Sequence, residues 1–284
     1  MQPFKVLDQG LVFDADRAPP DRQACYFTSL AQLDSGMLLA GWQTGPTKHS
    51  PTNTIRIARS LDQAESWQIV PWDFATSLDG TPGSLAAAEM VEAEPGRLLL
   101  FSTWFDRSDP ERPLFNPETE GILRSRQIFS ISNDEGDSWS PWQVIPTPGL
   151  TGCATTGPAI KWADGAIAHA FESFKEFDDP EPAVHGAWLI LTRDGGRSFE
   201  APWLIARDPA DQVYYWDQRL FAGDETGEFL ALFWTHDRAA QKDLPLHQLL
   251  ASLADGSQAA PQPQATSIPG QIASAGMTAD GRLL

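Results

Sequence analysis

A turn motif that recurs at a nearly constant interval constrains this chain more than any other feature. The segments "SLDQAESW", "SNDEGDSW" and "TRDGGRSF" share the pattern Ser/Thr-x-Asp-x-Gly-x-x-aromatic, with Ala in place of Gly in the first copy. A fourth copy, "SLADGSQA", has lost the Asp and the aromatic residue. The third position of the motif falls at Asp62, Asp134, Asp194 and Ala254. These positions are 72, 60 and 60 residues apart, and a period of this size indicates a repeat architecture.

The residue types of the motif suit a tight turn between two strands. An Asp carboxylate accepts hydrogen bonds from backbone amides of its own turn, Gly adopts positive φ, and the aromatic ring packs beneath the hairpin. We therefore expect Asp62, Asp134 and Asp194 to have a structural role.

A second repeated element precedes each of these turns and has the pattern of a β-hairpin. Apolar strands flank a Gly-containing turn in "TSLAQLDSGMLLAGW" and "AEMVEAEPGRLLLFSTW", and again in three later segments. The turn glycines, spaced 60, 69, 62 and 54 residues apart, are Gly36, Gly96, Gly165, Gly227 and Gly281. Alternating strands closed by such turns predict antiparallel pairs. Each unit then has the four strands of one β-propeller blade.

Composition and charge exclude several classes of function. The chain has 284 residues and a formal net charge of −18, which would repel a phosphate backbone or an anionic bilayer. We expect no nucleic-acid partner and no membrane partner. Cys25 and Cys153 lie far apart without a CxxC pair, so we expect no disulfide framework, no metal and no cofactor. The first residues lack the features of a signal peptide, which predicts a cytoplasmic protein unless the N-terminus is incomplete.

The turn motif resembles the Asp-box, or BNR repeat, of the sialidase (neuraminidase) superfamily. The resemblance runs through nearly the whole chain at about 60 residues per unit. It implies an all-β, six-bladed β-propeller of the sialidase type that forms a single domain over residues 1–284. The sequence ends within the second strand of a fifth unit, so we expect the propeller to be truncated there. Residues 4–13 would supply the outer strand of the last blade.

Alternating strand direction divides the loops between two faces. The Gly hairpins and the repeated Asp turns share one face, and the loops after each second strand share the other face with the connections between blades. Unusual polar residues and tryptophans gather on that second face, where we expect the site. The expected catalytic residues are Asp217, Tyr215, Glu172 and His236. The expected substrate-binding residues are Arg219, Arg107, Asp106, Glu89, Trp216, Trp234 and Asp237.

The segment "VYYWDQRL" is the most informative of these. Because side chains alternate along a strand, Tyr215, Asp217 and Arg219 are expected to lie in a row on one face. Sialidases use a tyrosine nucleophile, and arginines bind carboxylates through paired hydrogen bonds. The row would therefore bring a hydroxyl, a carboxylate and a guanidinium to the end of an inner strand.

The resemblance implies exo-α-sialidase-like hydrolysis of a terminal sugar, acidic or neutral, by a glycoside hydrolase with a carbohydrate partner. Tyr26 replaces the arginine of the family's Phe-Arg-Ile-Pro motif, and the first-blade loop offers His49 where the family has an Asp acid. The family's tyrosine belongs to a last blade that this sequence lacks. Two alternatives stay open: a non-catalytic carbohydrate-binding propeller, and a lyase or isomerase of acidic sugars that uses His236 or His247. The sequence does not specify an oligomeric state.

Overall fold

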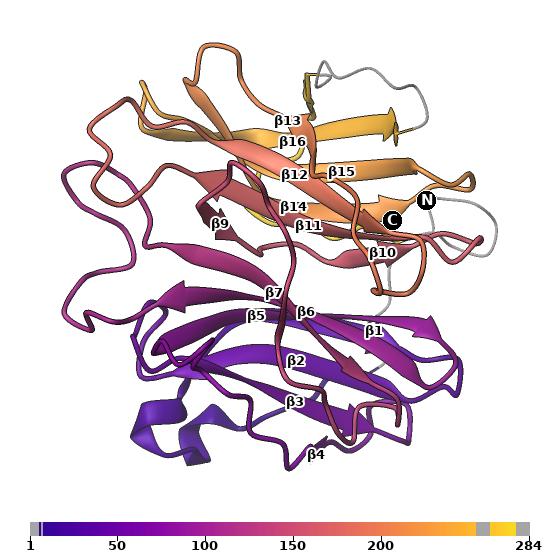
Figure 1. Cartoon of the computed structure of the whole chain (residues 1–284). Coiled ribbons are helices and arrows are strands. Elements are labelled where there is room, and N and C mark those ends of the chain that lie inside the picture. Colours follow the sequence, from indigo (N-terminus) through magenta and orange to yellow (C-terminus); the bar gives the residue numbers. More distant parts are fainter. Residues whose placement is uncertain (1–5, 7, 254–261, 277–284) are drawn as a thin grey trace.

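Four antiparallel sheets, one for each repeat, make up the computed structural model, which describes residues 6, 8–253 and 262–276 (Figure 1). The first sheet contains β1 (Ala24–Gln32), β2 (Leu38–Gly45), β3 (Thr54–Ser60) and β4 (Gln68–Ile69). The second contains β5 (Gly83–Glu94), β6 (Arg97–Asp106), β7 (Ser125–Ser132) and β8 (Gln143–Val144). The third contains β9 (Gly152–Ala154), β10 (Ala159–Lys161), β11 (Ile167–Phe174), β12 (Gly186–Thr192) and β13 (Trp203–Ala206). The fourth contains β14 (Val213–Ala222), β15 (Glu228–Asp237), β16 (Lys242–Ser252) and β17 (Gln264–Ala265).

Helical structure is almost absent. Two short 3₁₀ turns, η1 (Ala15–Arg17) and η2 (Pro20–Arg22), are the helical segments of the described residues. None of those residues forms a helix long and apolar enough to span a membrane. The chain is therefore all-β, as its sequence pattern predicts.

The first two strands of every sheet form the predicted hairpin. Gly36, Gly96, Gly165 and Gly227 occupy the turns with φ between 77° and 90°, a conformation that glycine adopts without steric cost. In the third sheet the inner strand is interrupted before Pro158, so that β9 and β10 each pair with β11. Proline has no N–H to donate to a strand ladder, which accounts for the break.

Neighbouring sheets pack in the order of the chain. In Figure 1 the first sheet, in indigo, lies at the bottom and the fourth, in orange and yellow, lies at the top. Leu39 and Leu98 belong to an apolar cluster between the first two sheets, and Phe171 belongs to the cluster between the second and third. Leu189 and Phe233 belong to the cluster between the third and fourth sheets. No comparably extensive contact joins the fourth sheet to the first among the described residues.

The architecture is thus a four-bladed propeller arrangement, and the expected six blades and truncation are not supported. The hairpin around Gly281 and the fourth turn motif at Ala254 lie outside the described residues. The described part of segment 4–13, Val6 and residues 8–13, forms no strand.

The repeated Asp turns share one hydrogen-bonding pattern. The Asp134 carboxylate accepts hydrogen bonds from the Ser138 amide (2.9 Å) and hydroxyl (2.5 Å) and from the Ser132 hydroxyl (2.7 Å). Equivalent bonds occur at Asp62 and Asp194. The Ser198 hydrogen bonds lower the pKa of Asp194 to about 2. All three carboxylates therefore serve their own turns.

The first turn carries a backbone strain that the other two avoid. Ala64 has φ of 74° where Gly136 has 92° and Gly196 has 88°, and the left-handed region costs a residue with a Cβ about 1–2 kcal/mol. We expect Ala64→Gly to raise the free energy of unfolding by about 0.5–1 kcal/mol, after the greater entropy of unfolded glycine is subtracted. Urea denaturation of the two proteins measures this difference in the free energy of unfolding.

Gly136→Ala is the reciprocal control for this prediction. The new Cβ would lie 3.3 Å from Leu39 Cδ1, and the alanine would have to adopt positive φ. The substitution should therefore destabilise the fold. A destabilised Ala64→Gly protein would show that the turn is not strained at Ala64.

Candidate active site

A cavity of about 440 Å³ opens on the face opposite the Asp turns. The first residues of the inner strands and the loops after β2, β6, β11 and β15 surround it, as the alternation of strand direction predicts. Its size lies within the range of small-molecule sites. The residues of its wall with ionisable or aromatic side chains include Lys48, Arg107, Glu172, Asp217, Trp234 and His236.

A bulge recurs near the start of the inner strands and decides which side chains reach the cavity. Phe27, Ala87 and Asp217 have φ of 48°, 65° and 47°, and the strand register shifts at each of these positions. Two residues of a bulged strand oppose one residue of the partner, which interrupts the alternation of faces. Asp217 adopts this conformation more easily than a branched or bulky residue would.

The expected row of Tyr215, Asp217 and Arg219 is wrong for this reason. Tyr215 is 6% exposed and belongs to the core, where its ring centre lies 5.5 Å from that of Phe233 and 5.9 Å from that of His247. Neither Tyr215 nor Arg219 lines the cavity, whereas Asp217 does. The bulge between Trp216 and Arg219 interrupts the alternation, so Tyr215 is not in a row with Asp217, whereas the charge of Arg219 still acts on Asp217.

Glu172 and Asp217 form a carboxyl pair at the base of the cavity. Glu172, on β11, is 2% exposed, and its Oε1 accepts hydrogen bonds from the Asp217 amide and the Thr156 hydroxyl, each at 2.5 Å. Burial, and then the negative charge of Asp217, raise the pKa of Glu172 to about 8. A buried carboxyl beside another carboxyl retains its proton, so Glu172 is neutral at pH 7.

Asp217 has a different electrostatic environment from its partner. Burial raises its pKa, while the positive charges of Arg219 and Lys48 lower it. The net effect raises the pKa of Asp217, and the negative charge that Asp217 carries when ionised raises the pKa of Glu172. A protonated carboxyl beside an ionised one is the arrangement that supplies both an acid and a base or nucleophile.

Arg107 gives the cavity a buried positive charge. It is 5% exposed, and its three nitrogens donate to Ser84 Oγ (2.9 Å), Arg112 O (3.3 Å) and His49 O (3.1 Å). None of the ion pairs found among the described residues includes it. Burial lowers the pKa of Arg107, and a buried charge without a counter-ion is costly unless a ligand neutralises it.

Lys48 reinforces this positive end of the cavity. Its ammonium lies 5.2 Å from the centre of the Phe27 ring, where it makes a cation–π contact. Burial and the charges of Lys48 and Arg107 lower the pKa of His49. The loop after β2 and the start of the loop after β6 thus bring two cations and a neutral imidazole together.

Rings from the fourth sheet cover the other side of the cavity, and we call them the blade-four wall. The wall consists of Tyr214, Trp216, Trp234 and His236. The Trp216 ring centre lies 4.9 Å from that of Trp234, 5.1 Å from that of His236 and 5.3 Å from that of Tyr214. Burial raises the pKa of Tyr214 to about 12. The wall is aromatic, whereas Lys48 and Arg107 make another part of the cavity cationic.

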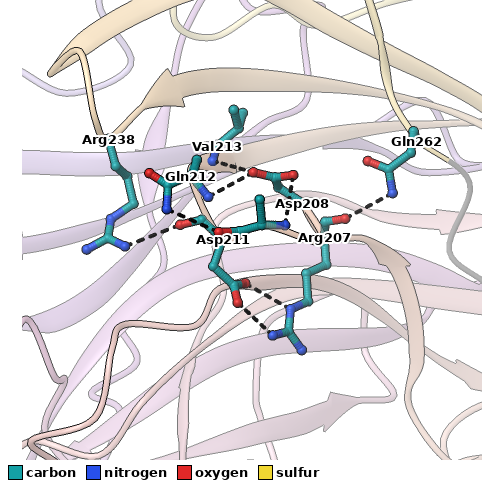
Figure 2. A network of polar contacts seen from close by, with 8 residues as sticks. Arg207, Asp208, Asp211, Gln212, Val213, Arg238 and Gln262 are labelled. Carbon is teal, nitrogen blue, oxygen red and sulfur yellow. Dashed lines mark hydrogen bonds and ion pairs between the residues drawn. The ribbon is translucent and has the colours of Figure 1, made fainter.

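The loop between β13 and β14 supports this side of the site (Figure 2). Arg207 makes two hydrogen bonds to the Asp211 carboxylate, at 2.9 and 2.8 Å. Asp208 accepts hydrogen bonds from two backbone amides at the start of β14. The carbonyl of Asp211 accepts a hydrogen bond from Arg238 at 3.3 Å. The network fixes the backbone from which Tyr214 extends.

Arg238 connects the fourth sheet to the loop between β6 and β7. Its guanidinium lies 4.8 Å from the centre of the Tyr214 ring and forms an ion pair with Glu120. Since Glu120 belongs to the loop of the second sheet, this pair joins two parts of the cavity wall. The positive charge of Arg238 is thereby already neutralised.

Four further residues expected in the site lie outside the cavity wall. Glu89 is 5% exposed, and burial raises its pKa to about 7 while Arg219 lowers it. Arg219 donates a hydrogen bond to the carbonyl of Thr156, so it supports the residue that binds Glu172. Asp106 and Asp237 accept hydrogen bonds from backbone amides of their own turns. Short polar side chains after a strand often cap turns in this way. The positions of Asp106 and Asp237 after their strands therefore reflect turn formation.

Lys48, Thr156 and Tyr214 are among the cavity-lining residues that were not expected in the site from the sequence. Thr156 lies two residues before the proline that interrupts the inner strand of the third sheet. The proline is the feature of the sequence that could have pointed to this segment. Tyr214 reaches the cavity in place of Tyr215 because of the bulge.

Comparisons with known proteins identify the fold class. No family model matches the sequence, and no curated protein matches it significantly. Among solved structures, a Hadza microbial sialidase is 17% identical with a TM-score of 0.59, over 81% of this chain and 45% of that one. The intramolecular trans-sialidase from Ruminococcus gnavus is 10% identical with a TM-score of 0.63, over 90% and 73%. The endo-arabinase from Bacteroides thetaiotaomicron is 14% identical with a TM-score of 0.56, over 90% and 86%.

These neighbours are glycoside hydrolases with a propeller fold, and at such identities the likeness shows the fold alone. The chain spans less than half the length of the Hadza sialidase.

Proposed function

We propose that the protein is a glycoside hydrolase that removes a terminal acidic sugar, an exo-sialidase-like activity. The observation that carries the proposal is the pair formed by Glu172 and Asp217, a protonated and an ionisable carboxyl in one cavity. Two carboxyl groups with these roles are what most glycoside hydrolases require. The glycoside hydrolases among the structural neighbours support the same class of reaction.

Glu172 has the properties of the general acid. In its neutral state it donates a proton to the glycosidic oxygen as the bond to the leaving group breaks. Thr156 and the Asp217 amide hold one of its oxygens, which leaves the other oxygen for the substrate. Asp217, once ionised, attacks the anomeric carbon or activates a water molecule.

A tyrosine nucleophile is less well supported by the described residues. Tyr214 is the tyrosine that lines the cavity, and a pKa raised to about 12 by burial disfavours its phenolate. Tyr215 lies in the core. The proposed chemistry therefore depends on the carboxyl pair and not on the sialidase tyrosine.

The cationic end of the cavity supports an acidic substrate. Arg107 brings positive charge to a buried location, and the exposed Lys48 adds a second cation to the cavity wall. A guanidinium binds a carboxylate through two parallel hydrogen bonds. A carboxylate on the sugar would neutralise Arg107, which has no carboxylate partner among the described side chains.

A panel of 4-methylumbelliferyl glycosides tests this proposal. The panel should contain N-acetylneuraminic acid, glucuronic acid, galactose and arabinofuranose as the cleaved sugar. We expect turnover of an acidic member. An ultraviolet-absorbing unsaturated product would indicate a lyase instead, and saturable binding without turnover of any member would indicate a carbohydrate-binding propeller.

A further inference from the structure

Two parts of the cavity wall differ in chemistry, and Asp217 lies within electrostatic reach of Lys48 in one of them. Lys48 and Arg107 come from loops of the first two sheets, whereas the fourth sheet provides aromatic rings. Arg238, the cation beside those rings, is already paired with Glu120. Asp217 directly follows Trp216 along β14. A glycosidic bond placed at the carboxyl pair would therefore have different surroundings on its two sides.

His236 is held in a fixed orientation within the blade-four wall. Its Nδ1 lies 2.8 Å from Asp243 Oδ1, and its ring stacks on Trp216 with an interplanar angle of 21°. Gln271 donates a hydrogen bond to the other oxygen of Asp243 at 3.1 Å. The hydrogen bond from His236 lowers the pKa of Asp243, so the carboxylate is ionised and accepts the proton of Nδ1.

This orientation leaves one nitrogen of the ring for a ligand. When Nδ1 carries the proton of a neutral imidazole, Nε2 is a hydrogen-bond acceptor. No partner of Nε2 occurs among the described residues. His236 lines the cavity, and a sugar hydroxyl is the complementary donor.

The same surroundings disfavour a negatively charged group. The Asp243 carboxylate is in contact with His236, and the Glu120 carboxylate is paired with Arg238, which contacts the wall at Tyr214. Aromatic faces bind the apolar C–H face of a sugar ring while its hydroxyls keep polar partners. A neutral sugar fits these features better than an acidic one.

We propose that the blade-four wall is a separate subsite for a neutral sugar, the leaving group of the reaction, with His236 as its hydrogen-bonding anchor and Asp243 as the residue that positions His236. The inference rests on the proposed function and deepens it. The bond cleaved would join a terminal acidic sugar to a neutral one. Arg107 and His236 would then recognise opposite halves of the same substrate.

Binding measurements on the full chain with Glu172→Gln separate the two subsites without turnover. The neutral probes are methyl β-galactopyranoside, methyl β-glucopyranoside and methyl α-arabinofuranoside, and the acidic probes are N-acetylneuraminate and glucuronate. Saturation-transfer NMR and calorimetry give the affinities. We expect His236→Gln to weaken the neutral probe that binds best by about tenfold, the loss of about one well-placed hydrogen bond. The acidic probes should be unaffected by it.

Arg107→Gln is expected to do the reverse, weakening an acidic probe and leaving the neutral one unchanged. His247→Gln, on the opposite side of the fourth sheet against Tyr215, is the matched control and should change neither. Asp243→Asn keeps the imidazole but removes its anionic acceptor, so it should weaken the neutral probe as well. It also serves if His236→Gln does not fold.

The results separate this inference from the proposed function. Suppose that no glycoside is hydrolysed, but His236→Gln still weakens only the neutral probe and Arg107→Gln only the acidic one. The hydrolase function is then wrong, and the separate subsite is supported. The subsite is wrong if His236→Gln leaves the affinity for the neutral probe unchanged or weakens neutral and acidic probes equally. It is also wrong if the Glu172→Gln protein binds none of the neutral probes. Hydrolysis of an acidic glycoside would then still support the proposed function.

Discussion

Replacement of Glu172 by Gln should reduce kcat by about 10²- to 10⁴-fold, the contribution of a positioned general acid. Gln keeps the size of the side chain and can still accept the hydrogen bonds from Thr156 and the Asp217 amide. Its amide is not acidic enough to transfer a proton to the glycosidic oxygen. KM should change much less than kcat, because the binding groups of the cavity are untouched.

The same substitution should not destabilise the protein at alkaline pH. The folded-state pKa of Glu172 is raised to about 8 by burial and by Asp217, above the value of about 4.3 for an unfolded chain. A group with a raised pKa gives its full stabilisation below the unfolded pKa and loses it as pH rises through the folded pKa. The wild-type protein therefore loses stability between pH 4 and pH 8, and Glu172→Gln should lose less.

Thermal melting at several pH values measures this difference. Glu135→Gln, in the repeated turn on the opposite face, is the matched control and should keep both activity and its pH dependence of melting. A Glu172→Gln enzyme with near wild-type kcat would exclude Glu172 as the acid.

Replacement of Arg107 by Gln should weaken binding of an acidic sugar by about 2–5 kcal/mol, the usual effect of truncating one member of a buried charge pair. The reason is that Arg107 is buried and no carboxylate of the described residues neutralises it. Arg107→Lys should restore part of the affinity, since an ammonium retains the charge but not the planar pair of donors. Affinity is measured by calorimetry.

Thermal stability provides the control for this second prediction. Arg107→Gln removes no salt bridge but loses hydrogen bonds to Ser84, Arg112 and His49, so it should melt only slightly below the wild type. A protein that melts early yet binds acidic sugars normally once folded would show that Arg107 only supports the loop after β6.

The sequence predicted the repeat, the hairpins and the face of the site, because these depend on local chemistry. Gly36 and Gly96 mark turns through their positive φ, and Asp134 marks a turn through its own hydrogen bonds. Glu172, Trp216 and His236 line the cavity because strand direction determines which end of a blade they occupy, and their roles there stay predictions.

The details within the site depended on features that a pattern of alternation does not contain. The bulge at Asp217 turns Tyr215 into the core and Tyr214 toward the cavity. The hydrogen bond between Glu172 and the amide of Asp217 joins residues of the third and fourth sheets that are 45 positions apart in the chain. Neither local propensity nor spacing specifies such contacts, since they arise only when neighbouring blades pack.

The pH dependence of kcat/KM for a hydrolysed acidic glycoside tests the central claim most directly. Glu172 acts as an acid only while protonated, and its pKa is about 8. Activity should therefore be maintained below pH 8 and fall above it, and Glu172→Gln should remove this alkaline limb along with most of the rate. A wild-type profile that stays flat through pH 9, or an unchanged alkaline limb in Glu172→Gln, would contradict the assignment of the cavity as a carboxyl-pair active site.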